Sequence, residues 1–471
     1  MGFVAVIMAS PIGSFLFRMV VSYALGKIMQ KKAPGAGGAG SRAVMVNKNS
    51  NNDAIPVVYG KTRMGGTRAY INSSDGSGDL AGTEYLNIVM SMCEGEVGTI
   101  NQLWFNDDIV WDDAQGGTLD GSGKLTGFIG DYASVLNESV IRFHSGTDGQ
   151  TVDTDLQSSV GSGVWTNDAR LRGKAYIAMK LKADSEAYEG GMPLVTATIE
   201  GKRIVDVNSL TEGQTSPGTL YNGADVNPID VLYDYLVSRR YGKGLDHDSN
   251  GQYVAGLHID IDSFKAAKAL AAPKYKINGV IDTSRLIYNN IGEILESMNA
   301  VLAFRQGRYF VRIKHAAEPT AMVITNDEIL SQVTVSTPAK ADKLNKVTAG
   351  YRNPASGTDY NDDIIVIENA TYQSEDNGSI FETRIDLDLV DDATLVNELA
   401  TYIMDSSRFG MSISFDAVHT VIIVEAGDII EMDLPNFGWS NKKFRVIGME
   451  LTPDNTISIQ AVEYEATIEL I

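Results

Sequence analysis

The chain has 471 residues, enough for about three domains of ordinary size, each with its own hydrophobic core. Its 39 Lys and Arg against 60 Asp and Glu give a net charge of −21, which argues against a protein that coats nucleic acid. Hydrophobic residues make up 44% of the chain and charged residues 21%, which excludes an intrinsically disordered protein. Cys93 is the only cysteine, so the chain forms no internal disulfide and no cysteine-based metal site.

Residues 1–46 are predicted to be an apolar arm followed by a Gly-rich linker at Pro34–Ser41. Pro11 and Arg18 interrupt the apolar stretch, and no basic residues precede it, so a membrane anchor and a signal peptide both fit poorly. The other interpretation is an arm that protein buries, or that meets a membrane later. The side chains expected to make these contacts are Phe3, Val4, Ile7, Phe15, Leu16, Phe17, Val20, Val21 and Leu25.

Changes in pattern divide the remaining chain into three units. Residues 47–224 are predicted to form a β-rich unit, because strand-like alternation brackets a loop-rich insertion at about 106–190 that is dominated by Gly, Asp, Ser and Thr. Residues 225–320 have the pattern of an α+β unit, and residues 321–471 that of a second β-rich unit with one helix. The predicted fold class is therefore α+β, mainly β, in a multidomain chain.

The clearest local signal is a helix near residue 228. Asn227 is a typical N-cap, and Pro228 suits the first helical position. The apolar side chains that follow recur on one helical face, and they are Ile229, Leu232, Tyr233 and Leu236. We expect Tyr241 and Gly242 to follow this buried helix, with Gly242 and Gly244 ending it.

Three further helices are predicted. Asp262 is expected to cap a short helix, and Ser284 a longer one that runs to Met298. A hairpin turning at Gln306-Gly307 follows, and the last helix spans Ala393 to Asp405. Helices and strands thus alternate in the middle of the chain.

One loop has the opening of a calcium-binding motif. Asp246, Asp248 and Asn250 occupy positions 1, 3 and 5 of an EF-hand pattern, with glycine at position 6. Position 12 is Leu257, however, so the bidentate glutamate is missing. A polar turn is the preferred interpretation, and we predict neither a metal nor any other cofactor.

Catalytic chemistry has little support in the residue pattern. Adjacent acids could serve a cell-wall hydrolase, and the pairs are Asp107-Asp108, Asp112-Asp113, Asp362-Asp363 and Asp391-Asp392. They lie in loop-like or helix-starting sequence, where exposure and helix capping are the ordinary explanation. Cys93 lies in an apolar stretch without a histidine nearby. We therefore expect no enzymatic activity.

Several motifs together resemble a known family. The helix from Asn227 to Leu236, followed by Tyr241-Gly242-Lys243-Gly244-Leu245, resembles the signature helix of the central tail hub proteins of long-tailed bacteriophages. That family includes the hub core of lambda tail protein J and the hubs of gene transfer agents. Further matching segments follow in order, at 278–283, 295–300, 426–430 and 438–446. Each motif is a modest signal, but their order over about 400 residues is specific.

A second resemblance lies upstream of the helix. The apolar arm, the Gly-rich linker and the segment 55–65 are similar to the C-terminal part of the lambda tail assembly protein I. The chain departs from protein J in ending at Ile471. We therefore expect host recognition to belong to another protein, or to a fibre that docks on this one.

The resemblance implies a structural protein of the virion at the distal tip of the tail. It implies a homotrimer in which two tube-like antiparallel β-barrel domains per subunit continue the tail tube. Such a hub closes the tube, adapts its symmetry to the tip and fibres, and opens for DNA ejection into the host. The implied partners are the distal tail protein and tail tube, the tape measure protein, and a tail fibre or receptor-binding protein.

The charge and the arm fit this role in different ways. Three copies carry 3 × −21 = −63, and an acidic wall would let DNA pass through the lumen without sticking, although the charge could also serve solubility alone. The arm would contact the lumen, the tape measure protein or a host membrane. A different class stays open, namely a secreted or surface-attached β-rich protein that binds carbohydrate or hydrolyses the cell wall.

Overall fold

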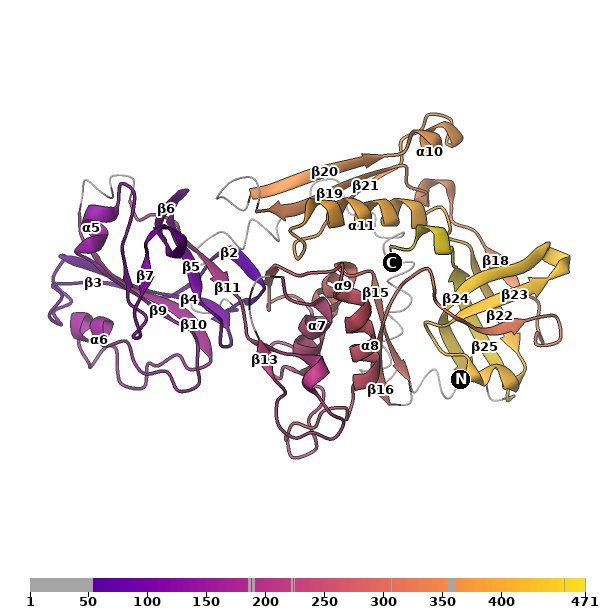
Figure 1. Cartoon of the computed structure of the whole chain (residues 1–471), viewed down its shortest axis with the longest axis horizontal. Coiled ribbons are helices and arrows are strands. Elements are labelled where there is room, and N and C mark those ends of the chain that lie inside the picture. Colours follow the sequence, from indigo (N-terminus) through magenta and orange to yellow (C-terminus); the bar gives the residue numbers. More distant parts are fainter. Residues whose placement is uncertain are drawn as a thin grey trace.

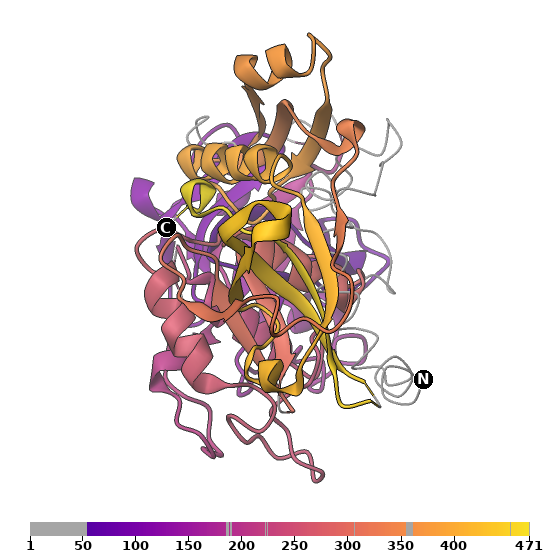
Figure 2. The same cartoon turned by 90° about the vertical axis from the view of Figure 1, so that its right-hand side faces the viewer.

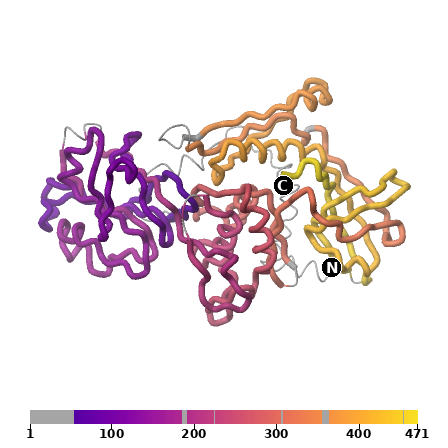
Figure 3. Tube along the Cα trace, in the orientation of Figure 1, coloured from indigo at the N-terminus to yellow at the C-terminus, as the bar shows by residue number. Residues whose placement is uncertain are grey.

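The computed structural model describes residues 54–470 except 185–187, 189, 190, 222, 224, 306, 355–360 and 453. The arm predicted at residues 1–46 lies outside the described residues. Figures 1 and 3 place the first β unit at one end of the long axis and the last strands at the other, with residues 204–313 and 346–406 between them. Within the described ranges, no helix has the length and apolar character needed to cross a membrane.

Two four-stranded antiparallel sheets form the first β unit. One has the order β3-β4-β10-β9, and the other β2-β11-β5-β6. The strands are β2 (Lys61–Gly65), β3 (Thr67–Ser74), β4 (Tyr85–Glu94), β5 (Ile100–Phe105), β6 (Asp108–Asp112), β9 (Val140–His144), β10 (Lys174–Lys182) and β11 (Val195–Glu200). The chain passes from one sheet to the other at Gly66, where an added Cβ would lie 2.7 Å from Met92 Sδ. A glycine at this corner lets the two sheets pack closely.

Short elements fill the insertion of this unit. They are η2 (Asp113–Gln115), β7 (Thr118–Leu119), β8 (Leu125–Thr126), α5 (Ala133–Asn137) and α6 (Thr154–Val160). Asp153 caps α6, its carboxylate accepting the Leu156 N–H at 2.8 Å. Leu156 and Val160 then pack with Tyr176 in a small core of their own.

The middle of the chain is a three-helix unit with short strands. Its elements are β12 (Ile204–Val205), η3 (Val207–Ser209), β13 (Leu220–Tyr221), α7 (Pro228–Val237), α8 (Ile261–Ala271), β14 (Gly279–Ile281), α9 (Ile287–Glu296), β15 (Ala300–Arg305) and β16 (Arg308–Ile313). The predicted helix at Pro228 is confirmed, with the Asn227 side chain accepting the Ile229 N–H, although it ends at Val237, before Gly242. Its apolar face is wholly buried against α8 and α9.

The two predicted caps that follow were wrong. Asp260, not Asp262, caps α8, because Ile261 already belongs to the helix and buries its side chain. Ser284 does not cap α9, since its hydroxyl donates instead to the Asp282 carboxylate at 2.6 Å. In both cases the neighbouring aspartate is the better acceptor for the local turn.

Two sheets form the C-terminal part. A three-stranded sheet, β20-β19-β21, carries α11 on one face, and a six-stranded sheet has the order β17-β23-β24-β25-β22-β18. The elements are β17 (Thr320–Ile324), β18 (Thr334–Ser336), η4 (Lys340–Asp342), β19 (Lys346–Asn353), β20 (Asn361–Glu368), α10 (Ala370–Glu375), β21 (Glu382–Asp386), α11 (Ala393–Ser406), β22 (Ser412–Ala417), η5 (His419–Ile423), β23 (Ile429–Leu434), η6 (Pro435–Phe437), β24 (Trp439–Leu451), β25 (Ile457–Glu463) and η7 (Ala466–Ile468). Figure 2 shows α10 and the end of the smaller sheet projecting from the body.

The predicted fold class, α+β and mainly β in several units, is confirmed. The six-stranded sheet surrounds its own apolar core, as a tube-like domain should. Among the described strands, however, no sheet closes into a barrel, because β17 and β18 end the strand order as edges. The sheet is also mixed, since β17 runs parallel to β23 and therefore reaches it by a crossover.

Candidate functional site

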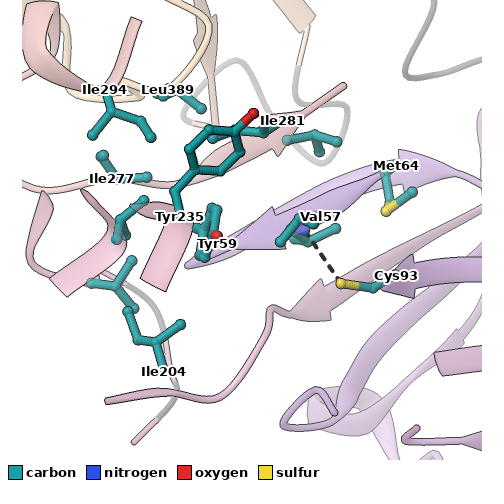
Figure 4. Close-up of a cluster of buried hydrophobic side chains, with 14 of the residues drawn as sticks. Val57, Tyr59, Met64, Cys93, Ile204, Tyr235, Ile277, Ile281, Ile294 and Leu389 are labelled. Atoms are coloured by element: carbon teal, nitrogen blue, oxygen red, sulfur yellow. Dashed lines mark hydrogen bonds between the residues drawn. The ribbon is translucent and has the colours of Figure 1, made fainter. Parts of the chain in front are cut away.

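A segment of the tail hub resemblance, 278–283, lies beside the segment 55–65 of the second resemblance. β1 (Val57–Tyr59) pairs antiparallel with β14, Val58 lying opposite Val280. The Thr283 hydroxyl extends this pairing by donating to the Ile55 carbonyl at 2.8 Å. Figure 4 shows the apolar side chains that gather around β1 from both units. We call this region the junction, defined as residues 55–65, 225–241, 278–283 and 389–391.

A single buried amide ties the junction together. Asn278 is 3% exposed, and its Oδ1 accepts the N–H of Lys61 at 2.9 Å and that of Asp225 at 2.8 Å. Its Nδ2 donates to Asp225 Oδ1 at 2.8 Å and to Asp391 Oδ2 at 3.0 Å. The partners come from the first β unit, the α+β unit and the segment before α11. One side chain therefore fixes three parts of the chain relative to one another.

Two glycines allow close approaches here, Gly60 to this amide and Gly279 to the backbone of residues 388 and 389. Gly60 has φ +70°, and an added Cβ would lie 2.1 Å from Asn278 Oδ1 and 2.3 Å from the Ile277 carbonyl oxygen. Gly279 would place a Cβ 2.7 Å from the Asp388 carbonyl oxygen. No other residue fits either position without moving backbone.

Helix α7 presents a partly buried acid to β1. Asp234 Oδ2 accepts the hydroxyls of Tyr59 and Tyr241, each at 2.7 Å, and Oδ1 accepts the Lys202 ammonium. Burial alone would lower the Lys202 pKa, but the facing Asp234 carboxylate outweighs it and raises that pKa. Burial, followed by Asp234, also raises the pKa of Tyr59. The motif residue Tyr241 thus serves to hold α7 against β1.

The glycine that follows has a steric role. A Cβ at Gly242 would lie 1.7 Å from the carbonyl oxygen of Tyr235, because the chain turns back across the end of α7. This close approach, and not the end of the helix, explains the glycine.

A second acid of α7 lies one turn before Asp234 on the same face of the helix. Asp230 is fully buried and accepts the Val207 N–H at 3.0 Å, the Tyr221 hydroxyl and the Lys268 ammonium at 2.6 Å. Burial raises its pKa, although these donors oppose the shift. The signature helix is therefore apolar on its core face and carries both acids on one adjoining face.

The candidate calcium loop is organised around its own backbone. Asp246 is fully buried, its Oδ1 accepting the N–H groups of His258 and Ile259 and its Oδ2 that of Gly256. Asp248 instead accepts the N–H of Asn250 at 2.9 Å in an exposed turn. No three acidic, His or Cys side chains in the described ranges are arranged to hold a metal ion.

The other acids and the cysteine also have structural partners. Asp112 caps η2, and Asp392 caps α11 by accepting the Thr394 N–H at 2.7 Å. Cys93 Sγ borders the junction and accepts the Val58 N–H at 3.3 Å, as the dashed line in Figure 4 shows. Burial raises the Cys93 pKa to about 12, which leaves the thiol unreactive.

A second ionic joint links the α+β unit to the six-stranded sheet. Arg445 on β24 donates through both terminal nitrogens to Glu318, at 2.7 and 2.9 Å, and Glu318 is 5% exposed. Arg312 on β16 donates to Asp428 at 2.8 Å, and both arginines donate to the Gly427 carbonyl. The motif segments 426–430 and 438–446 therefore also meet at a contact between units.

The sequence reasoning missed most of these contacts. Asn278, Lys202 and Glu318 were not selected as functional residues, because their partners are remote in the chain. The local signals were weak. Asn278 directly precedes a glycine and a strand, and Lys202 follows a Gly turn. The apolar residues of the arm, from Phe3 to Leu25, lie outside the described part of the chain.

Known proteins resemble the chain in sequence and in fold. No family model matches the chain. The baseplate hub protein pb3 of Escherichia phage T5 is 24% identical over 331 residues, covering 66% of this chain and 34% of that protein. The chain thus spans about a third of the length of this relative.

A solved structure matches over nearly the whole chain. A chain in the virion of a native gene transfer agent particle superposes with a TM-score of 0.65 at 13% identity, covering 96% of this chain and 93% of that one. This match shows a shared fold. Together the two comparisons confirm the resemblance to phage tail hub proteins that the sequence motifs predicted.

Gly60→Ala should destabilise the junction strongly. The new Cβ would overlap Asn278 Oδ1, and we expect a loss of roughly 3–5 kcal/mol in the free energy of unfolding. Gly378→Ala is the matched control, because Gly378 has φ +75° with open space around it, and it should cost only about 1 kcal/mol. Urea denaturation measures both. Equal losses would mean that backbone strain alone, without the contact to Asn278, accounts for the destabilisation by Gly60→Ala.

Glu293 on α9 should make stability depend on pH. Burial raises its pKa from 4.5 to about 7, although Arg285 opposes the rise. The folded chain therefore holds this proton more tightly than the unfolded chain, and the stability gained is complete below pH 4.5 and lost as the pH rises through about 7. Glu293→Gln removes the titration.

The wild type should therefore lose stability relative to Glu293→Gln as the pH rises. We expect the difference in their free energies of unfolding to change by about 1–3 kcal/mol from pH 5 to pH 8. Urea denaturation across that range measures the difference. Parallel profiles for the two proteins would contradict the burial argument.

Proposed function

We propose that the chain is a structural protein of a phage-like particle, the central hub at the distal tip of the tail, and not an enzyme. The observation that carries this proposal is the junction. The signature helix and segment 278–283 of the hub resemblance meet segment 55–65 there, and their contacts join the units into one body. The relative described as a baseplate hub protein and the fold shared with a virion chain support the same role.

The assembly that fits this role is a homotrimer. β17 and β18 form open edges of the six-stranded sheet within the described chain, and a closed ring of subunits would satisfy such edges. Three copies would surround the lumen with a charge of 3 × −21 = −63, over which DNA can pass without binding. The hub would close the tail tube, adapt its symmetry to the tip, and open for DNA ejection.

Several partners follow from this position. The distal tail protein and the tail tube would lie above the hub, the tape measure protein inside it, and a tail fibre or receptor-binding protein around or below it. DNA would be a partner only in transit. The N-terminal arm would contact the lumen, the tape measure protein or the host membrane.

The native mass of the purified full chain tests the assembly. One chain weighs 50.9 kDa, so a trimer weighs 3 × 50.9 = 152.7 kDa. We expect light scattering after size exclusion to give the trimer mass at every concentration at which the chain stays soluble. A stable monomer, or a hexamer, would contradict a trimeric hub.

A further inference from the structure

The six-stranded sheet has an apolar core of its own. This core shares no residue with the largest apolar cluster, which extends from the first β unit to α11. Two ion pairs span the boundary between the α+β unit and the sheet, Glu318 with Arg445 and Arg312 with Asp428. Polar groups that separate can bond to water instead, so such a boundary opens at a smaller cost than a continuous apolar core.

Residues 464–470 reach back across this boundary. Tyr464, directly after β25, donates its hydroxyl to the His315 carbonyl at 2.8 Å. The chain then turns through η7, which lies against α11, and Leu470 packs against the largest apolar cluster. Lys274 donates to the Leu470 carbonyl at 2.7 Å. Figure 1 shows this yellow end of the chain beside α11.

This segment covers charged side chains from both sides of the boundary. The Glu469 side chain is 4% exposed, its Oε2 accepts the Asn299 amide at 3.4 Å, and its Oε1 lies 3.7 Å from a guanidinium nitrogen of Arg445. Burial raises the pKa of Glu469, although Lys314 and Arg445 oppose the rise. Burial, followed by Arg445, lowers the pKa of Lys314 to about 8. The docked segment therefore holds both charges at a desolvation cost that ends when it leaves.

The attachment of this segment is shallow. Tyr464 is the one residue of 464–470 that is buried as a whole, and the others are partly or fully exposed. Segments with few buried apolar contacts open at a lower free energy than the core beside them. We propose that residues 464–470 form a releasable strap, which closes the boundary between the α+β unit and the six-stranded sheet when docked and frees the sheet to move when it leaves.

Release of the strap weakens the neighbouring ion pair as well. Arg445 lies between Glu469 and Glu318, and the Glu318 side chain is 1% exposed. Once the strap leaves, water reaches this pair, and an ion pair in water contributes little. One event thus loosens two contacts across the boundary. The inference does not depend on the hub role, since it uses only these contacts.

Spin-label distances in the full chain test the proposal. Ala266→Cys on α8 and Gln460→Cys on β25 place labels at exposed positions on the two sides of the boundary. Glu469→Arg with Leu470→Asp should undock the strap, because it sets a cation against Arg445 and a charge against the apolar cluster. We expect one main distance in the labelled parent, with an open minority of at most about 10%, and a second, broader distance in most molecules of the strap variant.

The matched control is Glu375→Arg, which reverses the charge of an exposed residue on α10 and should leave the distance unchanged. Cys93 can remain, since it is buried. An unchanged distance in the strap variant would overturn the proposal, as would loss of the whole fold, which would make the segment a fixed part of the core.

Hydrogen exchange of the unaltered full chain gives a second measurement. The Tyr464 N–H, bonded to the Lys443 carbonyl at 3.0 Å, should open at a lower free energy than the paired amides of β25. Equal opening free energies would mean that the strap leaves only when the sheet unfolds, and would also overturn the proposal.

Discussion

Gly60 and Asn278 share a space that admits no further atom, and the arrangement of the units depends on that contact. Because Gly60 has no side chain, the Asn278 amide reaches the backbone of β2 while it also binds Asp225 and Asp391. An asparagine suits this position, since its side chain carries both donors and acceptors. Any outward shift of the first β unit would leave these buried groups without partners, which costs more than a net hydrogen bond gains.

The ionic contacts serve the same purpose. Glu318 and Arg445 form a buried pair, and Asp234 and Lys202 a partly buried pair, where two units meet and not within one core. Buried pairs add little net stability compared with apolar packing, but they penalise every arrangement in which they are separated. The largest apolar core also extends from the first β unit to α11.

What the sequence could predict was local. The helix after Asn227 and the mainly β class follow from periodicity and capping, and the structure confirms both. Asp262 and Ser284 failed as caps because competing acceptors stood two residues away. The calcium-like pattern gave the right residue types in a turn, but the pattern could not show that Asp246 faces inward to meet three backbone amides.

The junction itself lay beyond local reasoning. Asn278 and Lys61 are 217 residues apart, and Asn278 and Asp391 are 113 apart, so no periodicity connects them. The resemblance did place segments 55–65 and 278–283 among the significant motifs, without indicating that they touch. In the structure the two segments are joined by strand pairing between distant units.

Hydrogen exchange of the native full chain tests the central claim most directly. If the junction is one cooperative body, the N–H groups of Lys61 and Asp225, both bonded to Asn278 Oδ1, should open only together with the core amides of α7. Their opening free energies should then be equal, and should fall together in Asn278→Ala. Exchange of the Lys61 amide at a markedly lower opening free energy than that of α7 would show that the first β unit moves independently, and would contradict the account.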